Sequence, residues 1–228
     1  MNFNIRNLWV LQVGPWEVWI TETHRNTWIL MAFLTLIALF IRSKLRHPKD
    51  IPEGLQNGVE AIIEIFDNFL RSTTSESLMY LGNWFFMVFA FILISNTSGL
   101  VGMRPPTADW ATTCAFALAT VIIIQVVGIR HRKGEYLRSF FEPHWLFFPL
   151  NLVNEISRPL SLSFRLFGNI LAGMILISML YALLPVALRF FLPVVLHAFF
   201  DIFYGAMQTY IFCVLSLTFI NSAADIHE

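Results

Sequence analysis

Charged residues are scarce in this sequence, and so are cysteines and the motifs that mark soluble enzymes. Of 228 residues only 13% are charged and 57% are hydrophobic, whereas a soluble domain has about 25% and roughly 45–50%. The net charge is zero, and no basic cluster is interleaved with aromatics, which argues against nucleic acid as a partner. Cys114 and Cys213 lie in apolar stretches without a CxxC pair. The phosphate-binding pattern GxxxxGK[ST] is absent too, so no cofactor, metal or nucleotide site is expected.

The sequence is instead rich in apolar blocks. Crossing a hydrocarbon core of about 30 Å takes roughly 20 residues of helix, and several blocks reach that length. We therefore predict a single all-α membrane domain over residues 1–228 with about five membrane helices. The predicted spans are Thr27 to Ile41, Met79 to Leu100, Ala108 to Ile129, Trp145 to Leu184 and Pro185 to Ala223.

Residues 53–71 have the pattern of an amphipathic helix and not of a span. Apolar residues recur at helical spacing, while Glu53, Glu60, Glu64 and Asp67 share the other face. Such a helix lies either on the membrane surface or against the bundle, and its acidic face favours contact with protein over anionic lipid.

Basic residues set the predicted orientation. They follow the first and third spans, at Arg42, Lys44, Arg46 and Lys49, and at Arg130, Arg132, Lys133 and Arg138. Because basic loops stay in the cytoplasm, residues 1–26 form an external segment and the C-terminus is cytoplasmic. That N-terminal segment lacks the apolar core and cleavage site of a signal peptide, so we expect it to be retained.

The last two apolar stretches are unusually long. A helix of about 40 residues would measure about 60 Å, twice the hydrocarbon thickness. Pro149, Pro159, Pro185 and Pro193 are candidate breakpoints, but no charged loop divides either stretch. We predict that residues 145–223 form a strongly tilted antiparallel hairpin.

Arg165 is the strongest functional candidate, because an ionisable residue inside a membrane helix is costly and needs an anionic partner or water. The alternative is a structural ion pair within the bundle. Ser161 and Ser157 lie one and two turns before it, and Asn169 one turn after it, so Arg165 sits on a polar stripe of small residues. Such a stripe serves close helix packing or a hydrated, sliding contact.

Polar residues from several other spans are predicted to fall in the outer half of the membrane. On the final helix, Asp201 and Gln208 share a face, and His197 lies one turn before Asp201, a combination typical of an ion or proton relay. The predicted directions bring a further set to the same depth, which suggests a water-filled pocket: Asn96, Asp109, Asn169, His197 and Asp201. Asp109 has a second interpretation, as the N-cap of its helix within the sequence PTAD.

The inner half holds fewer polar groups. Glu155, Ser157 and Ser161 lie on the cytoplasmic side of Arg165, as do Ser216 and Asn221 on the last helix. A second aqueous path is therefore conceivable there. Two half-paths that meet at a fixed cation describe a device that hands an ion to a moving carrier.

Residues 161–173, SLSFRLFGNILAG, closely resemble the signature of the a subunit of F-type ATP synthases. PTAD at 106–109, PLNL at 149–152, SRPLSL at 157–162 and GAMQTYIFCVL at 205–215 agree with that family in order and spacing. The resemblance covers nearly the whole chain from the first span onward. Its RLFGN form is similar to that of bacterial and plastid members.

The resemblance implies a hairpin that curves around a ring of c subunits, with Arg165 as the essential arginine, Gln208 as its partner on the last helix, and Asn169 also on the family pattern. It implies assembly with b subunits and the rest of the synthase, transport of H⁺ or Na⁺, and no nucleotide chemistry in this chain. The expected location is a bacterial cell membrane, ahead of a thylakoid or mitochondrial inner membrane. The competing interpretation is a self-contained secondary transporter or a respiratory membrane subunit, although no internal repeat is visible.

One feature departs from the family pattern. Many bacterial relatives have a glutamate where this chain has Met174, and a histidine or small polar residue where it has Asp201. The resemblance therefore implies that the carboxylate has changed helices.

Overall fold

The structure is a computed structural model, and it describes residues 7–13, 16–46, 51–141, 144–183, 185 and 192–224. The predicted positions Lys49 and Leu184, and residues 1–6 of the N-terminal segment, lie outside the described residues. The prediction of an all-α membrane protein is confirmed, because five helical stretches of the described residues are long and apolar enough to span a membrane: Glu22–Lys44, Glu76–Val101, Trp110–Arg132, Trp145–Leu183 and Pro193–Ala224.

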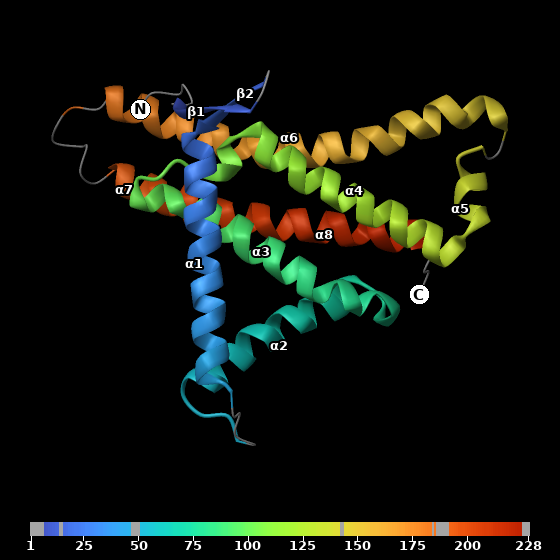
Figure 1. Cartoon of the computed structure of the whole chain (residues 1–228), viewed down its shortest axis with the longest axis horizontal. Helices are drawn as coiled ribbons and strands as arrows, with labels where there is room; N and C mark the ends of the chain where they lie inside the picture. The colour runs from blue at the N-terminus through green and yellow to red at the C-terminus, as the bar shows by residue number, and fades with distance from the viewer. Residues whose placement is uncertain are drawn as a thin grey trace.

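The N-terminal segment contains a β-hairpin that the sequence pattern did not predict. Strands β1 (Asn7–Val13) and β2 (Trp16–Thr21) pair antiparallel. Both are rich in tryptophan and β-branched residues, which favour strands. The first span, α1 (Glu22–Lys44), begins directly after β2 with Thr21 as its N-cap, which is five residues earlier than predicted. The hairpin therefore sits at the N-terminal end of α1 (Figure 1).

The buried residues of helix α1 all lie in its first half. Its buried residues are Thr23, Asn26 and Leu30, and the Asn26 side chain donates a hydrogen bond to the carbonyl of Arg104 at 2.9 Å. Beyond them the helix presents exposed apolar side chains such as Leu36, which is 64% exposed. Figure 1 shows α1 running across the direction shared by α4, α6 and α8. An apolar helix with this exposure is suited to lipid contact.

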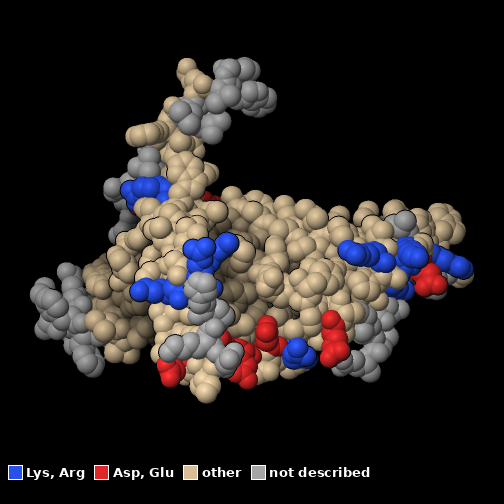
Figure 2. Space-filling model, turned by 60° about the horizontal axis from the view of Figure 1, so that its bottom comes forward, with Lys and Arg blue, Asp and Glu red and all other residues tan. Residues whose placement is uncertain are grey.

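The predicted amphipathic helix is α2 (Leu55–Thr73). It buries Phe66 and Leu70 against the bundle and exposes its acidic face. Asn221 on the last helix ties its end in place, because it accepts a hydrogen bond from the Thr74 hydroxyl and donates one to the Thr73 carbonyl, both at 2.7 Å. In Figure 2, charged side chains gather in a few separate groups, and most of the visible surface is uncharged.

The core lies where four helices pack together: α3 (Gly82–Thr97), α4 (Trp110–Arg132), α6 (Phe148–Leu183) and α8 (Gly205–Ala224). Large apolar side chains fill it, and the fully buried ones include Phe85, Ile92, Leu166, Phe212 and Leu217. Short elements join these helices: η1 (Glu76–Leu81), η2 (Ser98–Val101), η3 (Pro106–Ala108), α5 (Gly134–Ser139), η4 (Trp145–Phe147) and α7 (Leu192–His197).

The prolines do not divide the fourth span. Helix α6 is continuous over 36 residues and contains Pro159 in its interior, so it is about 54 Å long. The last span is less regular, because a π-helical stretch, η6 (Ala198–Tyr204), lies between α7 and α8. A π-helix within an α-helical span is rare and frequently marks a functional site. In this chain it carries Asp201.

Candidate functional site

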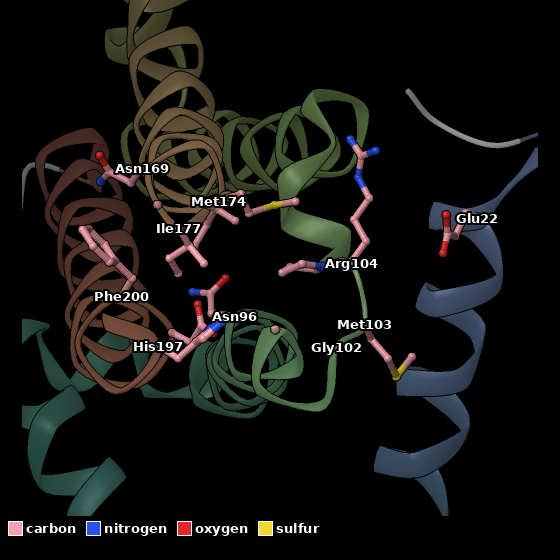
Figure 3. Close-up of a pocket in the computed structure, with 15 residues that line it drawn as sticks. Glu22, Asn96, Gly102, Met103, Arg104, Asn169, Met174, Ile177, His197 and Phe200 are labelled. Atoms are coloured by element: carbon pink, nitrogen blue, oxygen red, sulfur yellow. The ribbon is translucent and has the colours of Figure 1, made fainter. Parts of the chain in front are cut away.

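A cavity of about 260 Å³ opens between α6, η6, the end of α3 and the loop that follows α3. Four of the residues predicted to converge line it together: Asn96, Asn169, His197 and Asp201. Met174, the position that departs from the family pattern, lines the same cavity. Figure 3 shows Met174 and Ile177 of α6 directed into the space above Asn96 and His197. The carboxylate of Asp201 and the side chain of Met174 thus share one compartment.

Asp201 and His197 form an interacting pair on the last span. The imidazole Nδ1 of His197 lies 2.7 Å from the Asp201 Oδ2. The side chain of Asp201 is 15% exposed and that of His197 is 22% exposed. The pair borders the cavity and is not sealed in the core. A carboxylate beside an imidazole can hold a proton in more than one place or attract a cation, which is chemistry that an apolar cavity lacks.

Asn96 also lines the cavity, but its amide is used as a structural joint. The side chain is 1% exposed. It donates to the carbonyl of Gly205 at 3.1 Å and accepts from the Thr107 hydroxyl at 2.8 Å. These bonds hold the end of α3 against both η3 and the start of α8, so the wall of the cavity is rigid at this point.

Asp109 lies apart from the described residues that line the cavity. Its carboxylate accepts a hydrogen bond from the backbone N–H of Ala111 at 3.2 Å and caps α4. Of the two interpretations of PTAD, the capping role is the one that the geometry displays.

Asn169 and Gln208 connect α6 to α8. The amide nitrogen of Asn169 donates to the Gln208 carbonyl oxygen at 2.6 Å, and Gln208 is 3% exposed. A partly buried amide pair of this kind fixes the two helices in register. It stands one turn beyond Arg165, between the arginine and the cavity.

Arg165 points away from the bundle. It is exposed, while Leu162, Ser163 and Leu166 on the other side of α6 are buried. No hydrogen bond or ion pair links its guanidinium to any of the residues that the structure describes. The alternative of an ion pair inside the bundle is therefore not seen among those residues. This surface therefore presents a cation without a partner among the residues that the structure describes.

The polar stripe around Arg165 is exposed as well. Ser157 and Ser161 both lie on the surface, and the Ser157 hydroxyl donates only to the carbonyl of Asn154 within its own helix, at 3.1 Å. Close packing against another described helix does not account for the small residues here. From Ser157 to Arg165 the stripe is an exposed polar face about two turns long.

Glu155 lies near the start of α6, in a network whose polar side chains are bonded to one another. It accepts from the Gln125 amide at 2.6 Å and pairs with Arg158 at 3.1 Å. Arg158 in turn lies over the ring of Phe219, 5.5 Å from its centroid. The Tyr136 hydroxyl donates to Gln125 at 3.1 Å. Burial, and secondarily the negative charge of Glu155, raise the pKa of Tyr136, so that its hydroxyl remains a neutral donor.

The remaining inner residues of the prediction are not brought together. Asn221 is engaged with α2, and Ser216 is fully buried. Two charged residues that line the cavity were missed from the sequence: Glu22 on α1 and Arg104 in the loop after α3. Figure 3 shows both at the side of the cavity where α1 lies. The sequence placed Glu22 in the external segment; its position at the start of a span, level with the outer polar residues, was the available signal.

Five helical stretches that are long and apolar enough to span a membrane, with an exposed cation and a polar cavity among them, are the features of a multi-pass membrane protein. The sequence model described as "ATP synthase A chain" matches residues 26–221. The chain is 35% identical to ATP synthase subunit a of Moorella thermoacetica over 98% of its length and 99% of the relative's. It is 31% identical to the chloroplastic ATP synthase subunit a of Stigeoclonium helveticum, over 99% of this chain and 95% of the relative.

This chain belongs to the ATP synthase A chain family. An "ATP synthase subunit a 2" of Picosynechococcus is similar to it as well, with 35% identity over 92% of this chain and 88% of the relative. Membership favours the first interpretation of the sequence over a self-contained transporter or a respiratory subunit.

Proposed function

We propose that this chain is the ion-conducting a subunit of the membrane sector of a rotary ATP synthase, and that it passes H⁺ or Na⁺ to and from the carboxylates of a rotating c ring. The family membership supports the assignment to the membrane sector. The observation that carries the mechanism is Arg165, an exposed cation without a partner among the described residues. A cation in a low-dielectric surface favours the ionised form of any carboxylate that passes it.

The outer half-channel is the cavity lined by Asn169, His197 and Asp201. An ion entering it meets the Asp201 carboxylate beside His197, and then the Asn169–Gln208 bridge next to Arg165. Asn96 shapes the wall of this path through its hydrogen bonds. The carboxylate of Asp201 replaces the one that many relatives carry at position 174, since both positions open into the same cavity.

The inner half-channel follows the exposed stripe of Ser161 and Ser157. Glu155 borders its inner end as part of the ionic joint with Arg158. Because α6 is about 54 Å long, it must lie steeply tilted in a bilayer of about 30 Å. A tilted helix presents its stripe along the side of a ring of c subunits. The fixed charge of Arg165 separates the two half-channels and blocks direct leakage.

The proposed setting is a bacterial cell membrane, with assembly onto b subunits and the remainder of the synthase. The N-terminus and the cavity face outward, and the basic ends of α1 and α4 face the cytoplasm. Cysteines introduced at Gly102 are expected to react with impermeant thiol reagents from outside, and those at Lys133 from inside. The reverse labelling pattern would exchange the two half-channels.

The decisive experiment is Arg165→Ala in the assembled synthase. ATP synthesis driven by a ΔpH or a Na⁺ gradient in vesicles is expected to disappear, with the complex still assembled, because the exposed guanidinium contributes little to packing. Arg165→Lys should also be severely impaired, since a point charge does not replace the planar guanidinium. Arg42→Ala is the matched control, an exposed arginine in the last turn of α1. Synthesis near the wild-type rate in Arg165→Ala would overturn the proposal.

A further inference from the structure

The carboxylate of Asp201 rests directly against the α-carbon of Gly99 in η2. A Cβ atom built on Gly99 would lie 2.9 Å from the Asp201 Oδ2, 3.1 Å from its Cγ and 3.3 Å from its Oδ1. Cβ atoms are essentially never found closer than 3.0 Å to another heavy atom. Position 99 therefore has no room for a side chain while Asp201 keeps its present rotamer.

The same carboxylate is held from the other side by His197. The Oδ2 that a Cβ on Gly99 would meet most closely is also the oxygen 2.7 Å from the imidazole Nδ1. The Asp201 carboxylate thus fits between the His197 ring of the same span and the backbone of Gly99 in η2, just after α3. Neighbouring contacts fix that spacing, because Asn96 bonds to the carbonyl of Gly205 across the same junction.

We propose that Gly99 is a positioning residue for Asp201. Because Gly99 has no side chain, the Asp201 carboxylate can stay at the cavity in the orientation that bonds to His197. This inference rests on the proposed function, in which Asp201 belongs to the outer ion path. A side chain at position 99 moves the carboxylate away from His197 and raises the external ion concentration needed to drive the complex.

The backbone at Gly99 separates this role from the usual reasons for a glycine. Gly54 and Gly102 have positive φ values, whereas Gly99 does not, so alanine can adopt its conformation without strain. The three atoms nearest to the added Cβ all belong to the Asp201 side chain. Any consequence of Gly99→Ala must then pass first through Asp201.

The test compares Gly99→Ala with Gly58→Ala, a control at a glycine with no atom within 4 Å of the added Cβ. ATP synthesis in vesicles is measured against the external H⁺ or Na⁺ concentration and normalised to assembled complex. We expect Gly99→Ala to raise the apparent KM for the external ion about tenfold, on the scale of a misplaced functional group, with a smaller change in the maximal rate. Gly58→Ala should behave as wild type. An unchanged KM in Gly99→Ala overturns the inference.

The second arm repeats the change in an Asp201→Ala background. With the carboxylate removed, Gly99→Ala should cause no further loss of synthesis and no further loss of thermal stability of the complex, because the two effects are coupled through one contact. Should Gly99→Ala alone fail to assemble, restored assembly in the double variant supports the inference, and continued failure overturns it. An equal loss in both backgrounds overturns it too, because Gly99 would then serve helix packing.

The two proposals fail in different ways. ATP synthesis near the wild-type rate in Arg165→Ala refutes the proposed function. If Arg165→Ala abolishes synthesis but Gly99→Ala leaves the apparent KM unchanged, only the role of Gly99 is refuted. A silent Asp201→Asn also removes that role, since the carboxylate would then have no part in transport.

Discussion

The two ends of α6 use similar polar residues in opposite ways. Around Asn169, Asp201 and His197 the side chains surround about 260 Å³ of open space. Glu155 and Arg158 pair with each other, Gln125 donates to Glu155 and accepts from the Tyr136 hydroxyl, and Arg158 lies over the ring of Phe219. Each region contains an acid and a cationic or titratable partner, and the first of them lines a cavity.

Under the proposed function the first region is an ion route and the second is a structural joint, and the cavity distinguishes them. A buried charge is stable when its partners satisfy it, as Glu155 is satisfied. A structural joint requires all its hydrogen bonds and ion pairs to stay formed, whereas an ion route requires a group that can exchange one bonding partner for another. Arg165 lies between the regions and belongs to neither, since its side chain faces outward.

The largest effect is expected where the route is broken. Asp201→Asn should slow ion-driven ATP synthesis by about a hundredfold, the lower end of the range for loss of a proton-transfer group, because an amide cannot carry the charge or relay a proton. Adding Met174→Glu should restore part of the rate, since both positions open into one cavity. Synthesis in vesicles carrying the single and double variants measures both.

Asp67→Asn on the exposed face of α2 is the control for loss of a carboxylate as such. Full activity in Asp201→Asn would show that the Asp201–His197 pair is structural, like the Glu155–Arg158 pair. Lost activity without rescue by Met174→Glu would keep Asp201 in the path and reject the exchange between helices.

A smaller effect of a different kind is expected at the joint. Glu155→Gln leaves Arg158, whose side chain is 35% exposed, without its ionic partner, and should lower the stability of the protein by about 1–3 kcal/mol. Synthesis per assembled complex should change by less than about threefold, roughly 0.7 kcal/mol in activation free energy. Thermal unfolding of the complex and vesicle assays separate the two quantities, with Glu135→Gln on α5 as the exposed control. A loss of synthesis as large as that of Asp201→Asn would move Glu155 into the route.

The smallest effect is expected at the cap of α4. Asp109→Ala should cost about 1 kcal/mol of stability by removing the bond to the N–H of Ala111. Asp109→Asn keeps a capping oxygen, so it should restore most of that stability and leave synthesis unchanged. Slow synthesis in Asp109→Asn, with normal stability, would show that the charge takes part in transport and that the outer path is wider than the cavity.

The sequence by itself determined the class of the molecule. Apolar runs long enough to span a bilayer, the amphipathic pattern of residues 53–71 and the signature around Arg165 depend only on local order along the chain. Helix formation in an apolar run is local as well, because each backbone bond joins residues four apart. The depth argument brought Asn96, Asn169, His197 and Asp201 to one region for the same reason: span directions follow from the charges of the loops.

The tertiary structure decided which polar groups are open and which are closed. Glu155 and Asp201 are both acids on long apolar helices, and nothing local in the sequence shows that Gln125 bonds to one of them while a cavity adjoins the other. The contact of Asp201 with Gly99 joins positions about a hundred residues apart. Contacts of this kind arise from the packing of distant segments, where a difference of one side chain in a crowded junction decides whether a carboxylate meets water or a partner.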